Sequence, residues 1–332
     1  MTNHCPSLNR RSYLAATGSA GVLGLAGCVG GDSGSDSLLI GSVYAGGHAI
    51  NEMAMDWAET VEEETDGEIE ITIDQDFGGE GDLIEQTEIG SIDGSLIGAM
   101  WVDQFAPEVY WMECPFVFES WDQQYRAYME SEFGEMAFDA MVEDGNQRII
   151  GEPVYRGHRL LTSNEEITSP DDLSGVTIRV PELEDWVDIW SGLGAETSTI
   201  AFDELYSALE QGVADAQENP AETIRSMSLY EVQSHLILTE HLASTGWLSI
   251  NEDIWQGISE ENRELMESEL VAEIESLSDE IAQQEEEEIA ALEEEMEVIE
   301  PDIDEWLELA EPTLEDLFEE RWEGSTDEVD QI

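Results

Sequence analysis

Short apolar segments alternate with amphipathic helical segments along this chain, and the alternation restricts the fold more than any other feature. Residues 38–45 (LLIGSVYA) form a continuous apolar run typical of a buried strand. Apolar side chains recur every three or four positions over 50–61, which predicts a helix, and residues 68–73 (EIEITI) alternate like a half-buried strand. A predicted helix over 82–90 and a strand over 93–100 continue the series. This order predicts an α/β fold with helices on the faces of a sheet.

The same pattern returns in the second half of the chain. We predict a helix over 121–143, strands over 148–152, 157–163 and 176–180, and a strand over 242–250 that returns toward the first unit. A length of 332 residues is typical of roughly two domains. The chain is therefore predicted to form two α/β lobes.

One helical pattern is too long for a single small lobe. It runs from Ser259 to about Glu300, roughly 60 Å at about 1.5 Å per residue, and Pro301 ends it. Residues 283–288 (QQEEEE) interrupt its apolar seam, which disfavours a sustained coiled coil. We therefore expect one helix that spans both lobes.

The charge is extreme for a chain with a normal apolar content. The sequence has 80 Asp and Glu against 10 Lys and Arg, all ten of them Arg, and a net charge of −70, while 41% of its residues are hydrophobic. A solvated acidic shell around an ordinary core suits a protein from a halophile, because about 1 M salt shortens the Debye length to ~3 Å. Nucleic acid is disfavoured as a partner, because no basic patch is present to neutralise phosphates.

The N-terminus has the pattern of an export signal. Arg10 and Arg11 precede a short apolar stretch, as in twin-arginine signals, and residues 25–28 (LAGC) resemble the lipobox of exported lipoproteins. We expect residues 1–27 to be the signal, Cys28 to carry lipid, and residues 28–37 to be a flexible tether on the outer face of the cytoplasmic membrane. A plain secretory signal and an uncleaved anchor are the alternatives.

The sequence offers no catalytic or metal-binding constellation. The five histidines lack metal-ligand spacing, and no nucleophile elbow or dinucleotide fingerprint occurs. Outside the signal and the lipid candidate Cys28, only Cys114 remains, so no internal disulfide is expected. We expect neither cofactor nor enzyme activity but a binding protein, with its ligand in the crevice between the lobes.

Three of the ten arginines fall close together. Arg156 and Arg159 lie in VYRGHRLLT, and Arg179 lies in VTIRVP. The planar guanidinium binds a carboxylate through two parallel hydrogen bonds, so the cluster suggests a pocket for a small organic anion. The alternative is that these arginines only pair with surface carboxylates.

Several spaced motifs in this region resemble the solute-binding proteins of TRAP transporters, of the dicarboxylate type. They are GHRLLT at 157–162, SPDDLSGVTIRVP at 169–181, AFDELYSALEQGVADAQENP at 201–220 and YEVQSHLILTEH at 230–241. IGSIDG at 89–94 and ECPFVF at 113–118 extend the likeness upstream.

The resemblance implies a two-lobed clamshell like that of periplasmic binding proteins, with the long helix spanning both lobes. One lobe would hold 38–156 plus 245–284, and the other 157–244 plus 285–332. A small organic acid, such as a sugar acid or a dicarboxylate, would bind between them and be delivered to TRAP membrane subunits. A monomer is expected. A binding protein of an ABC-type importer for an anionic solute is the alternative.

The resemblance also implies site residues. Arg179 would grip the ligand carboxylate with two bonds, Arg159 would make a second contact, Asn219 would donate a hydrogen bond and Phe202 would pack on the ligand body. Two of these residues have competing structural roles, because Asn219 could cap a helix and Phe202 could belong to the core.

Three further residues are weaker ligand candidates. His48 and Trp101 are candidate contacts from the first lobe. Arg156 matches no known contact of the family and could pair only with surface acids.

Overall fold

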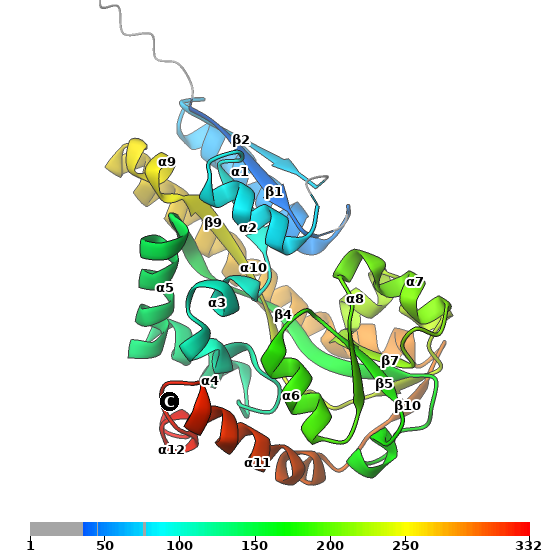
Figure 1. Cartoon of the computed structure of the whole chain (residues 1–332). Coiled ribbons are helices and arrows are strands. Elements are labelled where there is room, and N and C mark those ends of the chain that lie inside the picture. The colour runs from blue at the N-terminus through cyan, green and yellow to red at the C-terminus, as the bar shows by residue number, and fades with distance from the viewer. Residues whose placement is uncertain (1–35, 45, 76–77) are drawn as a thin grey trace, which may run out of the picture. The chain divides into compact units, whose positions relative to one another are not determined.

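The computed structural model describes residues 36–44, 46–75 and 78–332, and Figure 1 shows their arrangement. Residues 35–332 form one compact unit in which strands and helices alternate along the chain, which confirms the α/β prediction. The predicted signal, Cys28 and nearly all of the tether lie outside the described residues. Among those that are described, no helix combines the length and the apolar character needed to cross a membrane.

Three parallel strands form the sheet of the first lobe. They are β1 (Asp36–Ser42), β2 (Ile69–Asp74) and β3 (Gly94–Ile97), in the order β2-β1-β3. Helices α1 (Ala49–Glu64) and α2 (Glu80–Glu88) connect them. The apolar side chains of α1, every three or four residues, are buried, as its sequence pattern predicts.

Two long antiparallel strands follow β3 in the sheet. Strand β9 (Ala243–Asn251) pairs with β3 on one side and with β4 (Gln147–Ser163) on the other. The prediction of separate strands at 148–152 and 157–163 is wrong, because β4 is one strand of 17 residues. Gly151 and Gly157 adopt positive φ where the β4–β9 register shifts, so they bend the strand without ending it.

The bent strand β4 carries the sheet into the second lobe. There the order continues as β4-β7-β5-β6, with β5 parallel to both of its neighbours, while β8 joins β4 and β10 joins β8. These strands are β5 (Thr177–Val180), β6 (Glu196–Thr199), β7 (Ala216–Pro220), β8 (His235–Ile237) and β10 (Glu297–Ile299). Their helices are α6 (Glu184–Gly192), α7 (Leu205–Glu210) and α8 (Ala221–Ser226).

The remaining helices lie mainly over the first lobe and along its junction with the second. They are α3 (Met100–Phe105), α4 (Trp121–Met129), α5 (Glu132–Gly145), α9 (Glu252–Gly257), α11 (Ile303–Glu320) and α12 (Thr326–Val329), with 3₁₀ turns η1 (Pro107–Glu113), η2 (Pro170–Leu173), η3 (Phe202–Glu204) and η4 (Leu229–Glu231). The single helix predicted over 121–143 is two helices. The break falls where Ser131 caps α5 and its hydroxyl accepts from the amides of Phe133 and Gly134.

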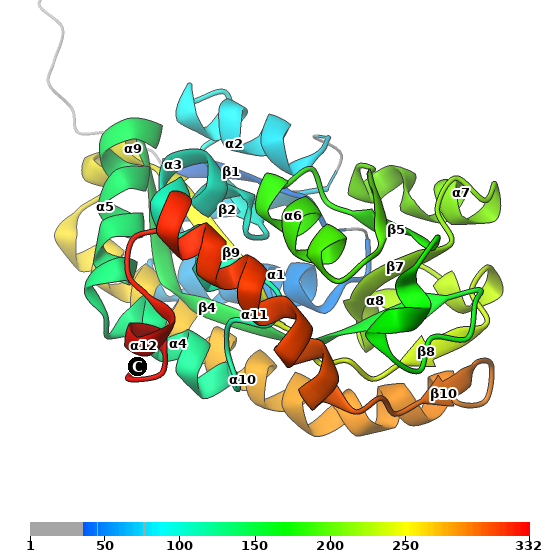
Figure 2. The same ribbon diagram turned by 60° about the horizontal axis from the view of Figure 1, so that its bottom comes forward.

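Helix α10 (Glu260–Leu292) has 33 residues, which corresponds to about 50 Å. It ends at Leu292, earlier than predicted, because the next residues form a turn and then β10. Met266 and Leu270 pack in the apolar cluster that contains α1, whereas Leu292 packs in the cluster of the second lobe. The helix thus spans both lobes, as predicted, and Figure 2 shows it reaching β10.

The C-terminal segment contacts the first lobe. Gln123 and Arg126 of α4 donate hydrogen bonds to the carbonyl oxygens of Val329 and Ile332, at 2.7 Å each. The assignment of 285–332 to the second lobe, like the other lobe boundaries, therefore stays a prediction.

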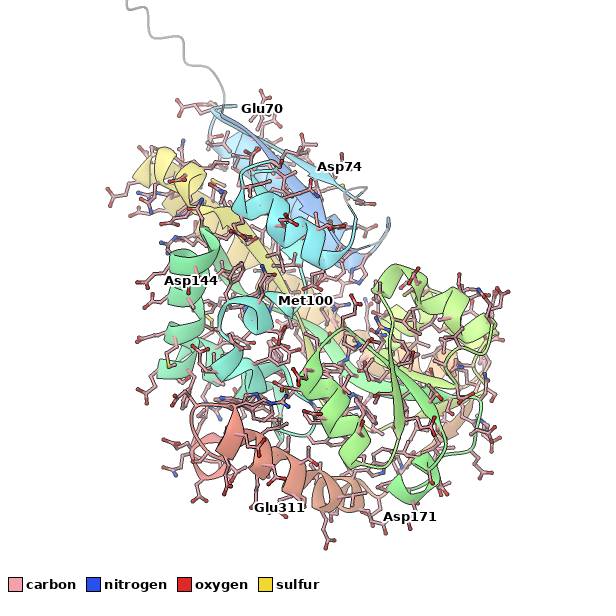
Figure 3. The ribbon with its side chains drawn as sticks, viewed as in Figure 1. Glu70, Asp74, Met100, Asp144, Asp171 and Glu311 are labelled. Atoms are coloured by element: carbon pink, nitrogen blue, oxygen red, sulfur yellow. The ribbon has the colours of Figure 1, made fainter. Side chains whose placement is uncertain are left out.

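Acidic side chains cover the outer surface of the described residues. Glu70, Asp144, Asp171 and Glu311 are exposed and point outward at widely separated places in Figure 3. The apolar clusters beneath them are ordinary, with fully buried Trp, Ile and Leu side chains. This separation agrees with an acidic shell around a normal core.

Candidate ligand-binding site

A cavity of about 620 Å³ lies where residues of both lobes meet. Part of its wall is built from the segments that follow the carboxyl ends of parallel strands, which is where open α/β sheets bind ligands. Segments after β1, β2 and β3 supply Val43, Tyr44, Gly78–Asp82 and Gly98–Met100, and segments after β5 and β6 supply Pro181–Leu183 and Ile200–Phe202. The volume suits a small ligand.

The strand register brings three predicted ligand residues to one edge of the second-lobe sheet. Arg159 of β4 pairs with Pro220 of β7, beside Asn219, and Arg179 of β5 pairs with Gln217 of β7. All three predicted residues line the cavity. Arg159 and Asn219, which are 60 positions apart in the sequence, are neighbours because β4 pairs with β7. Arg179 lies near them because β5 pairs with β7 on its other side.

Arg179 is a buried cation that retains hydrogen-bonding capacity. Its side chain is 3% exposed, and its Nε donates to the carbonyl oxygen of Ile200 at 2.8 Å. No carboxylate of the described residues lies within ion-pair distance of it, and Nη1 and Nη2 have no protein partner there. Burial lowers the pKa of Arg179 to about 10, which leaves the guanidinium charged at neutral pH. The two free amino groups can therefore bind a carboxylate in the cavity.

Arg159 is held by a buried acid. Its Nε and Nη2 bond to the carboxylate of Glu218, with Nη2 to Oε1 at 3.0 Å, and Nη1 donates to Ser244 Oγ at 3.1 Å. His241 Nε2 lies 3.2 Å from the same carboxylate. Burial alone would raise the pKa of Glu218, but Arg159 and His241 together hold it below the ordinary value. The guanidinium lies 5.1 Å from the ring centroid of Trp186, in cation–π geometry.

Asn219 lies in strand β7 and does not cap a helix. The cap position of α8 is Pro220, without a side-chain cap bond, so the alternative role of Asn219 is excluded. Its Oδ1 accepts from Arg159 Nη2 at 3.2 Å and its Nδ2 donates to Gln217 at 2.7 Å. Phe202 is half-buried. It lines the cavity, as a ligand contact would, and it also packs against the apolar cluster of the second lobe, as a core residue would.

Arg156 does not pair with surface acids, contrary to one expectation. Its side chain is buried, no carboxylate of the described chain forms an ion pair with it, and its Nη groups reach Ser244 at 3.1 Å and Thr223 at 3.4 Å. The guanidinium lies 4.8 Å from the ring centroid of Tyr44. Arg156 lines the large cavity and also a smaller one of about 250 Å³ beside α10.

His48 and Trp101 do not line the cavity. His48 caps α1, where Nδ1 accepts from the amide of Ile50, and its Nε2 lies 3.2 Å from Glu222 of α8. Trp101 is fully buried and stacks against Phe138, with ring centroids 5.8 Å apart. The structure therefore places both candidates outside the site, because one serves a helix end and the other a core.

The first lobe contributes three polar side chains that the sequence did not single out, Glu80, Tyr110 and Glu113, which we call the first-lobe wall. Burial raises the pKa of Glu80 to about 7 and that of Glu113 to about 7, against the hydrogen bonds that stabilise the charged forms. In a chain with 80 acids, no local pattern marks Glu80, and Glu113 is marked only as the first residue of ECPFVF. Only their position after β2 and within η1 brings them to the cavity.

Over residues 36–44, 46–75 and 78–332, no group of three or more His, Cys, Asp or Glu is arranged to hold a metal ion. The cavity presents three guanidinium groups and buried carboxyls instead. The arrangement suits recognition of a polar anion.

The fold and this site define a binding protein for a small polar anion, and comparison with known proteins agrees. The family of bacterial extracellular solute-binding proteins, family 7, matches residues 40–321, so the chain belongs to this family. Its members bind solutes for transport and are not enzymes.

Individual relatives show the same affiliation. A solute-binding protein of Roseobacter denitrificans is 35% identical over 65% of this chain and 68% of its own length. The sialic acid-binding periplasmic protein SiaP of Vibrio cholerae is 30% identical over 63% of this chain and 65% of its own.

Solved structures share the two-lobed architecture. A TRAP periplasmic solute-binding protein from Roseobacter denitrificans with bound L-galactonate superposes with a TM-score of 0.80 at 29% identity. The superposition covers 89% of this chain and 97% of that one. This likeness confirms the predicted clamshell.

Proposed function

We propose that this protein is the extracytoplasmic solute-binding component of a TRAP transporter and captures a small organic carboxylate between its two lobes. Arg179 binds the ligand carboxylate through Nη1 and Nη2, Arg159 makes a second contact through the free capacity of Nη1, Asn219 donates through its amide and Phe202 packs against the ligand body. The observation that carries the proposal is a buried, charged Arg179 whose two amino groups have no protein partner in the described chain.

A purely structural role does not account for Arg179 and Arg156. A buried cation without a carboxylate partner is costly, and structural arginines usually have one. Arg159 has such a partner in Glu218, whereas Arg179 and Arg156 do not within the described residues. Two guanidinium groups without a carboxylate partner in the described chain offer an anionic ligand charged hydrogen-bond donors at one cavity.

The N-terminal sequence pattern supports a proposal for location and anchoring. We infer that residues 1–27 are a twin-arginine signal, that Cys28 is lipidated and that residues 28–37 tether a monomeric body to the outer face of the cytoplasmic membrane. The acidic surface supports a halophilic source. Closure of the lobes on the ligand would present a new surface to the TRAP membrane subunits. Support for a TRAP rather than an ABC-type partner comes from the family and from the structures of its members.

A thermal-shift screen in molar salt tests the proposal. Sugar acids, dicarboxylates, keto acids and neutral sugars are added to the full-length protein and to its Arg179→Ala variant. We expect at least one carboxylate to raise the melting temperature of the wild type and not of the variant. A neutral sugar that stabilises both equally, with no effect of any carboxylate, would contradict the proposal.

A further inference from the structure

We propose that the end of the ligand opposite its carboxylate carries several hydroxyl groups, which bind the first-lobe wall of Glu80, Tyr110 and Glu113. The ligand class is then a polyhydroxylated monocarboxylate and not a dicarboxylate. This inference rests on the proposed function, because it takes Arg179 as the anchor of the ligand carboxylate.

The Tyr110 hydroxyl is the first observation. Tyr110 lines the cavity, its side chain is 0% exposed, and its hydroxyl has no hydrogen-bond partner in the described chain. A buried hydroxyl without a partner costs about 1–3 kcal/mol. Glu113 also lines the cavity but is not its partner, and Glu113 Oε1 accepts instead from Tyr128 at 2.8 Å and from Thr245 at 2.6 Å. A ligand hydroxyl can donate to or accept from the phenol oxygen.

Glu80 is the second observation. It is the first residue of α2, and its Oε1 accepts from the amide of Met100 at 3.0 Å, so the carboxyl is held at the cavity. With a pKa of about 7, the group exchanges between charged and neutral forms near neutral pH. Both forms can bind a hydroxyl, and the charged form accepts from it strongly. The same charged form repels a carboxylate.

The charge distribution is the third observation. In the described part of the chain before β4, the residues that line the cavity include Glu80, Asp82 and Glu113 but no arginine or histidine. The unpaired cations lie on β4 and β5 instead. A second carboxylate placed against Glu80 and Glu113 would therefore face acidic groups, whereas hydroxyl groups would find acceptors there.

Ligand preference tests the class. Calorimetry in molar salt compares D-gluconate, D-galactonate, L-gulonate, D-glucuronate and D-galacturonate with hexanoate, adipate and succinate on the full-length protein. We expect at least one hydroxylated acid to bind roughly a hundredfold more tightly than hexanoate and both dicarboxylates, because two or more hydrogen bonds at about tenfold each separate them. Hexanoate or a dicarboxylate binding as tightly as the best hydroxylated acid overturns the inference.

Two variants test the residues. Tyr110→Phe removes one oxygen and should lower the affinity for the tightest hydroxylated acid about tenfold. Glu80→Leu should lower it at least as much. Neither variant should weaken hexanoate binding. The matched controls are Tyr206→Phe, whose hydroxyl bonds Glu231 away from the cavity, and Glu85→Leu on the exposed face of α2, and neither should change any affinity.

The variants also distinguish a failure of this inference from a failure of the proposed function on which it rests. If Arg179→Ala abolishes binding while Tyr110→Phe and Glu80→Leu bind the hydroxylated acid as tightly as the wild type, only the further inference is wrong. If Arg179→Ala binds every acid unchanged, the proposed function of the site is wrong as well. Tyr110→Phe guards against misfolding, because removing an unpartnered hydroxyl should leave the melting temperature equal or higher.

Discussion

Replacement of Arg179 by Ala should reduce carboxylate affinity at least a hundredfold. The guanidinium is 3% exposed, is charged at neutral pH and offers two amino groups to the cavity. Truncation of one partner of a buried, hydrogen-bonded charge pair costs about 2–5 kcal/mol, and about 1.4 kcal/mol is tenfold. A hundredfold loss corresponds to about 2.8 kcal/mol, which lies in the lower half of this range. Salt screens it little, because the pair lies inside the protein.

Isothermal titration calorimetry in molar potassium chloride measures the loss directly. Arg179→Lys should also bind weakly, because an ammonium group cannot form two parallel bonds. Arg263→Ala removes the same charge from the surface of α10 and should bind like the wild type. Unchanged affinity of a folded Arg179→Ala protein would refute the assignment of this residue.

Three further predictions concern stability. Glu218→Ala should lower the free energy of unfolding by about 3–5 kcal/mol, because it leaves Arg159 buried and unpaired, and a change below 1 kcal/mol in denaturant titrations would contradict this. Glu113 has a folded-state pKa of about 7, above its unfolded value, so its contribution is full below about pH 4.5 and is lost as pH rises through 7. Relative to the wild type, Glu113→Gln should therefore stabilise the protein more at pH 8 than at pH 5. Melting curves that show the reverse would contradict a raised pKa of Glu113. The melting temperature of the wild type should rise steeply between 0.1 and 2 M salt, whereas a salt-independent value would argue against a halophilic protein.

Much of the fold could be predicted from local patterns. The apolar periodicity of α1 and the alternation in β2 report directly which face of each element is buried. The continuity of β4 could not be predicted, because glycines at 151 and 157 look like strand ends while serving as bends within a strand. The short strand β6 was missed, because its residues carry almost no apolar signal.

Only the side of the site formed by β4, β5 and β7 could be predicted from the sequence. The arginines of β4 and β5 stand out in a chain with ten cations, and the strand register then places Arg159, Arg179 and Asn219 together. The first-lobe side gave a weaker signal, since Glu80 is one acid among 80 and Glu113 is marked only as the first residue of ECPFVF. Trp101 was predicted as a candidate contact but is buried in the core. The local sequence could not show this, because a core aromatic and a ligand-facing aromatic have the same local pattern.

A crystal structure with the tightest-binding acid of the panel tests the central claim most directly. We predict that the ligand carboxylate lies within about 3 Å of Nη1 and Nη2 of Arg179, between the two lobes. Its hydroxyl groups should lie at Glu80 and Tyr110. A carboxylate bound away from Arg179, at Arg156 beside α10 or outside the cavity, would contradict the claim.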